Sequence, residues 1–124
     1  MTPDDAGPLP TPRRGEIWTA CLGEPPLRHW VLIVSLDARN LRAQSVLIIP
    51  FGSAGLEGPT AIRLAPGETG QTGLPGDSYL KGHFITTLQK AQLRDRLPRP
   101  LSSPRMRQVS AMIRRAFDPD APLA

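Results

Sequence analysis

Apolar and polar residues along the chain follow the pattern of short β-strands. Residues 15–22, "GEIWTACL", alternate between two faces, as in a half-buried strand. Residues 29–36, "HWVLIVSL", and 45–51, "SVLIIPF", are nearly unbroken β-branched runs, which are typical of central strands buried on both sides. Further strands are expected at 60–64, "TAIRL", and 78–88, "SYLKGHFITTL". Several short strands at this spacing predict a small barrel or sandwich.

Segments rich in proline and glycine separate and flank these strands. Pro50 cannot donate to a strand ladder, so a bend or bulge is expected there. Residues 65–77, "APGETGQTGLPGD", predict a long turn. The terminal segments 1–12, "MTPDDAGPLPTP", and 118–124, "DPDAPLA", predict a disordered leader and a disordered tail. One domain, at residues 13–117, remains between them.

Helical periodicity is confined to the C-terminal part of the domain. Ser103 is placed to cap a helix over 103–117, and Pro104 suits its first position. Apolar residues then recur at helical spacing, at Met106, Val109, Ile113, Ala116 and Phe117. A further short helical turn is expected in residues 89–97, "QKAQLRDRL", before Pro98.

Length, cysteine content and hydropathy narrow the class of protein. A chain of 124 residues, 40% of them hydrophobic, has room for a single core. The single Cys21 excludes an intramolecular disulfide and a cysteine-based zinc site, and fits a cytoplasmic protein. The apolar runs are too short to cross a bilayer and the N-terminal residues are not signal-like, so we expect no membrane association.

The positive charge is concentrated within the domain. All fifteen basic residues lie between Arg13 and Arg115, a span that holds seven of the eleven acids and therefore carries a net charge of +8. Thirteen of the fifteen are arginines, which bind phosphate through paired hydrogen bonds. This predicts a nucleic acid or an acidic protein as partner. The alternative is an arginine-rich composition in which arginine simply replaces lysine.

Candidate chemistry lies at the strand ends. Arg28 and His29 precede an aliphatic run and offer phosphate binding and proton transfer at one point, unless they are only a solvated strand end. Ser53, in "PFGSAG", lies where a strand turns away, a common place for a site, although an ordinary turn serine has the same pattern. The chain shows no zinc-ligand cluster, phosphate loop or nucleophile elbow, so no metal or cofactor is expected.

The order of the segments resembles one family of bacterial toxins. "RRGEIWTACL" is similar to the opening strand of the MazF/PemK family, and "VLIVSLDARN" and "SVLIIPFGSAG" are similar to its second and third strands. "PTAIRL", "GLPGDSYLKGHFITTLQKAQL" and the closing helix follow in the family's order. The resemblance extends from Arg13 to Phe117.

This resemblance implies an SH3-like β-barrel with a C-terminal α-helix, in a homodimer. It also implies the toxin of a type II toxin–antitoxin system. Such a toxin is a sequence-selective, metal-independent endoribonuclease that cleaves single-stranded RNA, and the acidic disordered segment of a cognate antitoxin inhibits it. Cleavage would proceed by attack of a ribose 2′-hydroxyl on its own phosphate, which needs a base, an acid and a cation.

The family's site residues are altered in this chain. Its usual Arg-Pro before the second strand is replaced by His29 and Trp30, with Arg28 displaced by one position, and its Thr-Ser after the third strand is replaced by Gly52 and Ser53. The resemblance therefore implies Arg28, His29 and Ser53 as catalytic residues, and Arg14, Trp30, Lys81 and Thr86 as RNA-binding residues.

Two other functions fit the same fold. "VLIIPFGSAGL" also looks like the third strand of CcdB, a gyrase poison without ribonuclease activity, although the ending "RRAFDPDAPLA" does not match the terminus of that family. The second alternative is a catalytically silent barrel that only binds RNA or an acidic partner.

Overall fold

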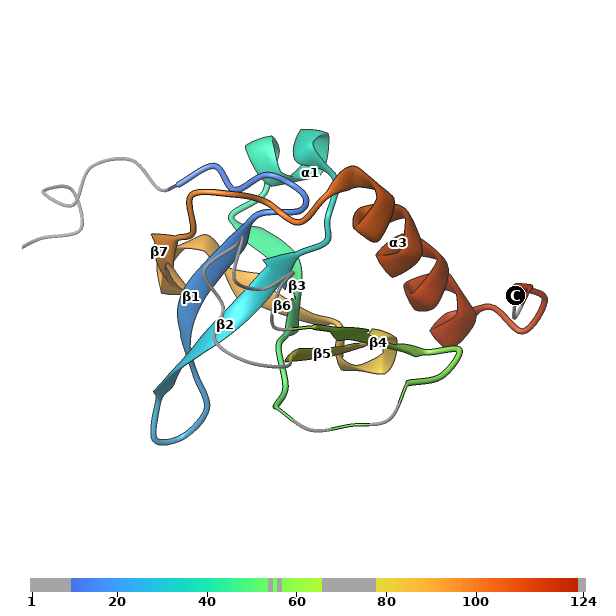
Figure 1. The fold of residues 1–124 in the computed structure, drawn as a ribbon. Coiled ribbons are helices and arrows are strands. Elements are labelled where there is room, and N and C mark those ends of the chain that lie inside the picture. Colours follow the sequence, from blue (N-terminus) through green and yellow to red (C-terminus); the bar gives the residue numbers. More distant parts are fainter. Residues whose placement is uncertain (1–9, 54, 56, 66–77, 123–124) are drawn as a thin grey trace, which may run out of the picture.

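Short strands and one long C-terminal helix make up a mainly β domain (Figure 1). The structure is a computed structural model that describes residues 10–53, 55, 57–65 and 78–122. Its elements are β1 (Ile17–Leu22), β2 (Leu27–Ile33), α1 (Asp37–Arg42), β3 (Ser45–Pro50), β4 (Ala61–Leu64), β5 (Ser78–Lys81), a 3₁₀ turn (Gly82–Phe84), β6 (Thr86–Gln89), a 3₁₀ turn (Lys90–Gln92), β7 (Leu93–Arg96) and α3 (Ser103–Phe117). The predicted class, mainly β with a C-terminal helix, is confirmed.

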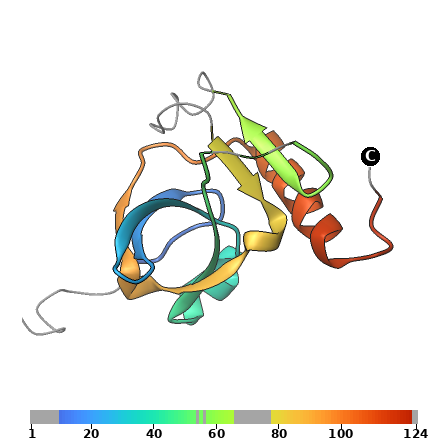
Figure 2. The ribbon, with the colours of Figure 1, turned by 90° about the horizontal axis from the view of Figure 1, so that it is seen from below.

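The strands form two antiparallel sheets in the part of the chain that is described. The larger sheet has the strand order β6-β3-β2-β1-β7 and curls strongly (Figure 2). β4 and β5 form a second sheet of two strands, linked to the end of β3 by a bridge between Gly52 and Tyr79. The predicted barrel is thus a curled sheet and a separate strand pair, without one continuous ladder among the described residues.

β2 runs through the centre of the large sheet and is buried on both faces at its C-terminal end. Val31, Leu32 and Ile33 are fully buried. Leu32 packs in the cluster beneath α3, together with Val109 and Met112. Val31 and Ile33 point to the other face, because successive residues of a strand alternate, and pack with Ala20, Val46, Ile48, Leu88 and Leu93. The expectation that the aliphatic runs are central strands is confirmed.

The predicted strand at 78–88 is two strands separated by a turn. β5 ends at Lys81, and the 3₁₀ turn Gly82–Phe84 redirects the chain into β6. Gly82 lies so close to α3 that a Cβ placed on it would be 3.0 Å from the carbonyl oxygen of Met112. This contact between segments distant in sequence could not be read from local hydrophobicity.

Two other local predictions were incomplete. The helix α1 was not predicted, because Leu36 just before it and Leu41 within it are exposed and give no periodic face. It is held instead by a buried polar pair, in which the Asn40 side-chain amide donates to the Ser35 carbonyl at 3.1 Å. The turn expected at 89–97 is the short Lys90–Gln92 segment, and the rest of that range is the strand β7.

The helix α3 is capped one residue before the predicted position. The hydroxyl oxygen of Ser102, not Ser103, accepts a hydrogen bond from the Arg105 backbone N–H at 3.3 Å. Pro104 lies in the first turn, where its missing N–H leaves no acceptor unsatisfied. Two adjacent serines carry the same sequence signal, so local pattern could not separate them.

The assignment of this cap predicts unequal effects of the two serines. Ser102→Ala is expected to lower the free energy of unfolding by about 0.5–2 kcal/mol, the usual cost of losing a capping side chain. Ser103→Ala, at the first position inside the helix, is expected to change it by less than about 0.5 kcal/mol. Urea denaturation of both variants measures the difference, and equal losses would contradict the assignment.

The end of α3 continues into a turn. Residues 118–122, part of the predicted disordered tail, are described, and the Asp120 N–H donates to the Asp118 carboxylate at 2.9 Å. That hydrogen bond and the Arg114 guanidinium, 3.2 Å away, hold the pKa of Asp118 below its ordinary value of 3.8. The ionised Asp118 therefore contributes to the free energy of unfolding at pH values above its ordinary pKa. This contribution is lost as the pH falls through the lowered pKa of the folded protein.

Two of the sequence predictions fall mainly outside the described residues. These are the leader, of which residues 10–12 are described, and the long turn at 65–77. No helix in the described ranges is long and apolar enough to span a membrane.

Candidate functional site

The β1–β2 hairpin projects beyond the rest of the large sheet and leaves one edge of β2 open (Figure 1). β3 pairs with β2 only at Val31–Ile33, and beyond this the Phe51 N–H donates to the Trp30 carbonyl at 2.9 Å. β3 ends at Pro50, where a bend was expected. Within the described residues, Leu27–His29 therefore pair with β1 alone.

Arg28 and His29 lie inside β2, not ahead of it. β2 begins at Leu27, so these two residues are consecutive in the strand and their side chains project from opposite faces of the hairpin. Both are exposed. A substrate group lying on one face meets only one of them, whereas a group at the open edge of β2 lies between the two faces and can be reached from both.

Asp95 is a neighbour of Arg28 that sequence reasoning missed. The Arg28 guanidinium donates to the Asp95 carboxylate at 3.2 Å, and the two side chains are 58% and 73% exposed. The Asp95 backbone N–H donates to the Thr19 hydroxyl at 3.0 Å, which places the acid across β1 from β2. Because 67 positions separate Arg28 from Asp95, only the strand order brings them together. An exposed pair of this kind orients the arginine and leaves it accessible to another anion.

Trp30 and the turn after β3 lie beside this edge. Trp30 is half-buried and packs, together with Phe51, against the core cluster under α3. Gly52 and Tyr79 then exchange two backbone hydrogen bonds of 2.9 Å, which link the segment after β3 to β5. Ser53 follows in an exposed position. Ser53 is thus two residues beyond Phe51, whose N–H bonds to Trp30 of β2.

A small aromatic cavity adjoins the same turn, on the β5 side. Its volume is about 250 Å³, and it is lined by Pro50, Phe51, Gly52, Tyr79, Lys81 and Phe84. The ammonium nitrogen of Lys81 lies 5.4 Å from the centroid of the Phe84 ring. This volume is below the range of pockets for drug-sized ligands. Aromatic walls with one cation suit a single unstacked base.

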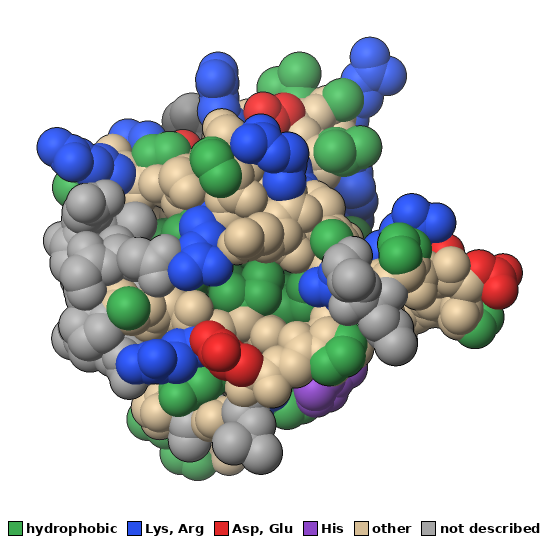
Figure 3. All heavy atoms as spheres, turned by 45° about the vertical axis from the view of Figure 1, so that its right-hand side comes forward, with side chains coloured by type: hydrophobic (Ala, Val, Ile, Leu, Met, Phe, Trp, Pro, Cys, Tyr) green, Lys and Arg blue, Asp and Glu red, His purple; other side chains and the backbone are tan. Residues whose placement is uncertain are grey.

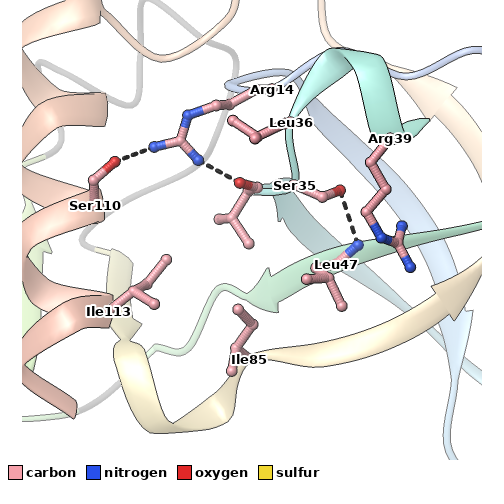
Figure 4. A pocket seen from close by; sticks show the side chains of 9 residues that line it. Arg14, Ser35, Leu36, Arg39, Leu47, Ile85, Ser110 and Ile113 are labelled. Atoms are coloured by element: carbon pink, nitrogen blue, oxygen red, sulfur yellow. Dashed lines mark hydrogen bonds between the residues drawn. The ribbon is translucent and has the colours of Figure 1, made fainter. Parts of the chain in front are cut away.

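Arg14 does not lie at this site. Its guanidinium donates to the Val34 carbonyl and the Ser110 hydroxyl, and its backbone N–H donates to Asp37 at 2.7 Å, so it joins the end of β2 to α3 (Figure 4). It borders an apolar groove of about 480 Å³ between the sheet and α3. Val34, the residue after β2, is six positions beyond Arg28, or about 20 Å at the usual rise of a strand. These acceptors are distant from Arg14 in the sequence, so only the fold reveals that its guanidinium is bound internally.

Thr86 is also separate from the open edge. It is exposed at the start of β6 and pairs with Ile48, which in turn pairs with Ile33 at the far end of β2. Arg28, His29 and Trp30 are thus consecutive in β2, Ser53 follows the Gly52–Tyr79 bridge, and Lys81 lines the cavity beside that bridge, whereas Arg14 and Thr86 lie elsewhere. Among the described residues, no three His, Cys, Asp or Glu side chains are grouped so as to hold a metal ion.

Solved structures similar to this one include toxins and endoribonucleases. An endoribonuclease from mycobacterial species, in complex with its cognate antitoxin, is 26% identical with a TM-score of 0.74, over 90% of this chain and 99% of that one. A further mycobacterial endoribonuclease is 25% identical with a TM-score of 0.73, over 92% and 98%. The Mycobacterium tuberculosis toxin MazF-mt6 shares the fold at 19% identity and a TM-score of 0.71, over 85% and 98%.

No curated protein matches the sequence of this chain. Residues 13–117 match the family model of the PemK-like, MazF-like toxins of type II toxin–antitoxin systems. That match covers most of the chain and agrees with the resemblance found in its strand segments. The chain therefore belongs to the family of PemK-like, MazF-like toxins.

Proposed function

We propose that this toxin is a sequence-selective endoribonuclease that cleaves single-stranded RNA at the open edge of β2. The observation that carries the proposal is this edge, which Arg28 and His29 flank from its two faces, with the Phe51–Ser53 turn beside it. The two mycobacterial structures compared above are endoribonucleases, which supports the same activity here.

The proposed reaction uses the 2′-hydroxyl of the RNA as its nucleophile. The 2′-oxygen bonds to the adjacent phosphorus while the bond from phosphorus to the 5′-oxygen breaks. A base takes the hydroxyl proton, and an acid gives a proton to the departing 5′-oxygen. The products are a 2′,3′-cyclic phosphate and a 5′-hydroxyl. DNA lacks the nucleophile, so it binds without being cut.

Each residue at the edge has a role in this scheme. The Arg28 guanidinium leaves Asp95 and donates two parallel hydrogen bonds to the phosphate, whose charge grows in the transition state. His29, on the other face, transfers protons, since an imidazole both accepts and donates near neutral pH. The Ser53 hydroxyl donates to a phosphate oxygen from the adjoining turn. No step draws on a cofactor.

The bases next to the cleaved bond have two aromatic contacts in this proposal. Trp30, on the same face of β2 as Arg28, offers a ring for stacking. The cavity between Phe51 and Tyr79 accepts one base, with Lys81 near its phosphate. Arg14, between the end of β2 and α3, and Thr86, at the start of β6, do not contact the RNA in this proposal.

The proposed partners follow from charge and shape. A cognate antitoxin binds through an acidic disordered segment to Arg14 and Arg39 at the groove between the sheet and α3, and its apolar residues contact Leu36 and Ile113 in that groove. Figure 3 shows hydrophobic side chains in a hollow on one face, with many Lys and Arg side chains around it. The active form is a homodimer, and its compartment is the cytoplasm, where RNA is available.

A comparison of RNA with DNA tests this function. Protein purified free of antitoxin is incubated with single-stranded RNA and DNA of identical mixed sequence. We expect both to bind and only the RNA to be cut. Cleavage of the DNA, or a folded protein that leaves both intact, would overturn the proposal.

A further inference from the structure

A second basic hollow lies between α3 and the outer edge of β4. Its volume is about 330 Å³, and its charged lining residues are Arg63 from β4, Arg105 and Arg115 from α3, and Glu57. Among the lining residues that the structure describes, three guanidiniums against one carboxylate give a net charge of +2. A concentration of positive charge in a concave surface attracts anions more strongly than the same charges spread over a convex one.

The fold determines the position of these arginines. Residues 105, 108 and 115 are three and seven positions apart, so they lie on one face of α3, the face turned toward β4. The Arg105 guanidinium donates to the Gln108 side-chain oxygen at 2.7 Å, and the Arg115 Nε donates to the Pro59 carbonyl at 2.6 Å. These bonds orient two of the planar groups along the hollow, at its helical side.

The chemistry of the lining favours an oxyanion with several acceptor oxygens. Guanidinium groups present pairs of parallel N–H donors, which match a phosphate better than the single ammonium of lysine does. The Gln108 amide lies within the same lining and adds a neutral donor. A phosphodiester group, with two non-bridging oxygens, satisfies this set.

The strand register connects this hollow with the candidate site. In the β4–β5 pair, Arg63 lies opposite Tyr79 and Ala61 lies opposite Lys81, so Arg63 shares a sheet face with two residues of the aromatic cavity. Side chains directly opposite each other in such a pair are about 5 Å apart at Cβ. An RNA strand that leaves the cavity can thus cross two strands and reach the arginines of α3.

From this geometry we infer that the hollow formed by Arg63, Arg105 and Arg115 binds backbone phosphates of the same RNA strand, outside the cleaved segment. The inference rests on the proposed RNA substrate. It makes RNA affinity depend on length, because only an RNA long enough to extend from the open edge of β2 across β4 reaches the hollow. Cleavage chemistry does not involve these arginines.

The test uses 2′-O-methyl RNA, which lacks the nucleophile and is not cut. Fluorescence anisotropy measures the affinity of a short and a long mixed-sequence oligonucleotide across a salt series. For the long oligonucleotide, log K falls with log salt less steeply in the Arg63→Gln/Arg115→Gln variant. The slope is expected to become smaller in magnitude by about 0.7 for each phosphate contact removed. Affinity for the short oligonucleotide, and cleavage of a short unmodified RNA, are expected to be unchanged.

Arg107→Gln is the matched control, since it removes the same charge from another face of α3. If the double variant unfolds at a lower temperature, Arg63→Gln alone replaces it in the test, because Arg63 is exposed. This single variant is expected to show half the change in slope. Equal slopes for the double variant and Arg107→Gln would overturn the inference while the proposed cleavage stands. The inference would also be overturned if the double variant bound RNA as the unaltered protein does and lost only the binding of a polyglutamate peptide, because the hollow would then bind acidic peptides. If the unaltered protein binds no RNA, the proposed function itself fails.

Discussion

Replacing Arg28 by alanine is expected to reduce RNA cleavage by about 100- to 1,000-fold, the usual loss when one donor to transition-state charge is removed. The fold should not suffer, because the arginine is 58% exposed and its ion pair with Asp95 is open to solvent. Such pairs contribute at most about 1 kcal/mol to stability. Single-turnover cleavage and thermal unfolding of the same preparation measure both quantities.

Two matched variants show whether position or charge is responsible. Arg28→Lys keeps the charge and loses the paired N–H donors, so we expect an intermediate rate. Arg94→Ala, at an exposed position of β7, removes an equal charge away from the β2 edge and is expected to retain cleavage. If Arg28→Ala cleaves as fast as Arg94→Ala, Arg28 has no catalytic role.

Gly82→Ala is expected to destabilise the domain by about 1–3 kcal/mol, the usual cost of overpacking. The added methyl group would lie 3.0 Å from the Met112 carbonyl oxygen and 3.3 Å from both the Ala116 Cβ and the Ile113 Cα. Two of these are backbone atoms of α3, so the helix must move away from the turn between β5 and β6. Denaturant unfolding should show a lower midpoint with an unchanged slope.

Gly58→Ala is the control for that substitution. No atom lies within 4 Å of a Cβ placed on Gly58, and its backbone is not in the left-handed region. Alanine there is expected to be neutral or to stabilise by up to about 1 kcal/mol, because it restricts the unfolded chain. Equal losses for Gly82→Ala and Gly58→Ala would contradict the close packing of α3 on the turn.

The strands that could be predicted are those whose burial is evident from local amino-acid composition. The aliphatic runs that became β2 and β3 are buried on both faces, so their composition alone identifies them. The break between β5 and β6 has no such signal. It depends on the contact of Gly82 with α3, which joins segments about thirty positions apart. Local periodicity therefore merged two strands into one.

The site could be predicted only in part, for the same reason. Arg28, His29 and Ser53 were found from their places at strand ends, but whether two neighbouring side chains share a face depends on where β2 begins. The partner of Arg28 is Asp95, which only the order β2-β1-β7 brings near. The resemblance implied Arg14 as an RNA-binding residue, whereas its guanidinium donates to the Val34 carbonyl, just after β2, and to the Ser110 hydroxyl of α3.

The most direct test of the proposed activity is an analysis of cleavage products. Antitoxin-free protein is incubated with a long single-stranded RNA in the presence of EDTA, and the new ends are identified by mass spectrometry. The proposed reaction yields fragments with 2′,3′-cyclic phosphate and 5′-hydroxyl ends. Intact RNA in the presence of folded protein would contradict it and leave a barrel that only binds. Fragments with 5′-phosphate ends would contradict attack by the 2′-hydroxyl.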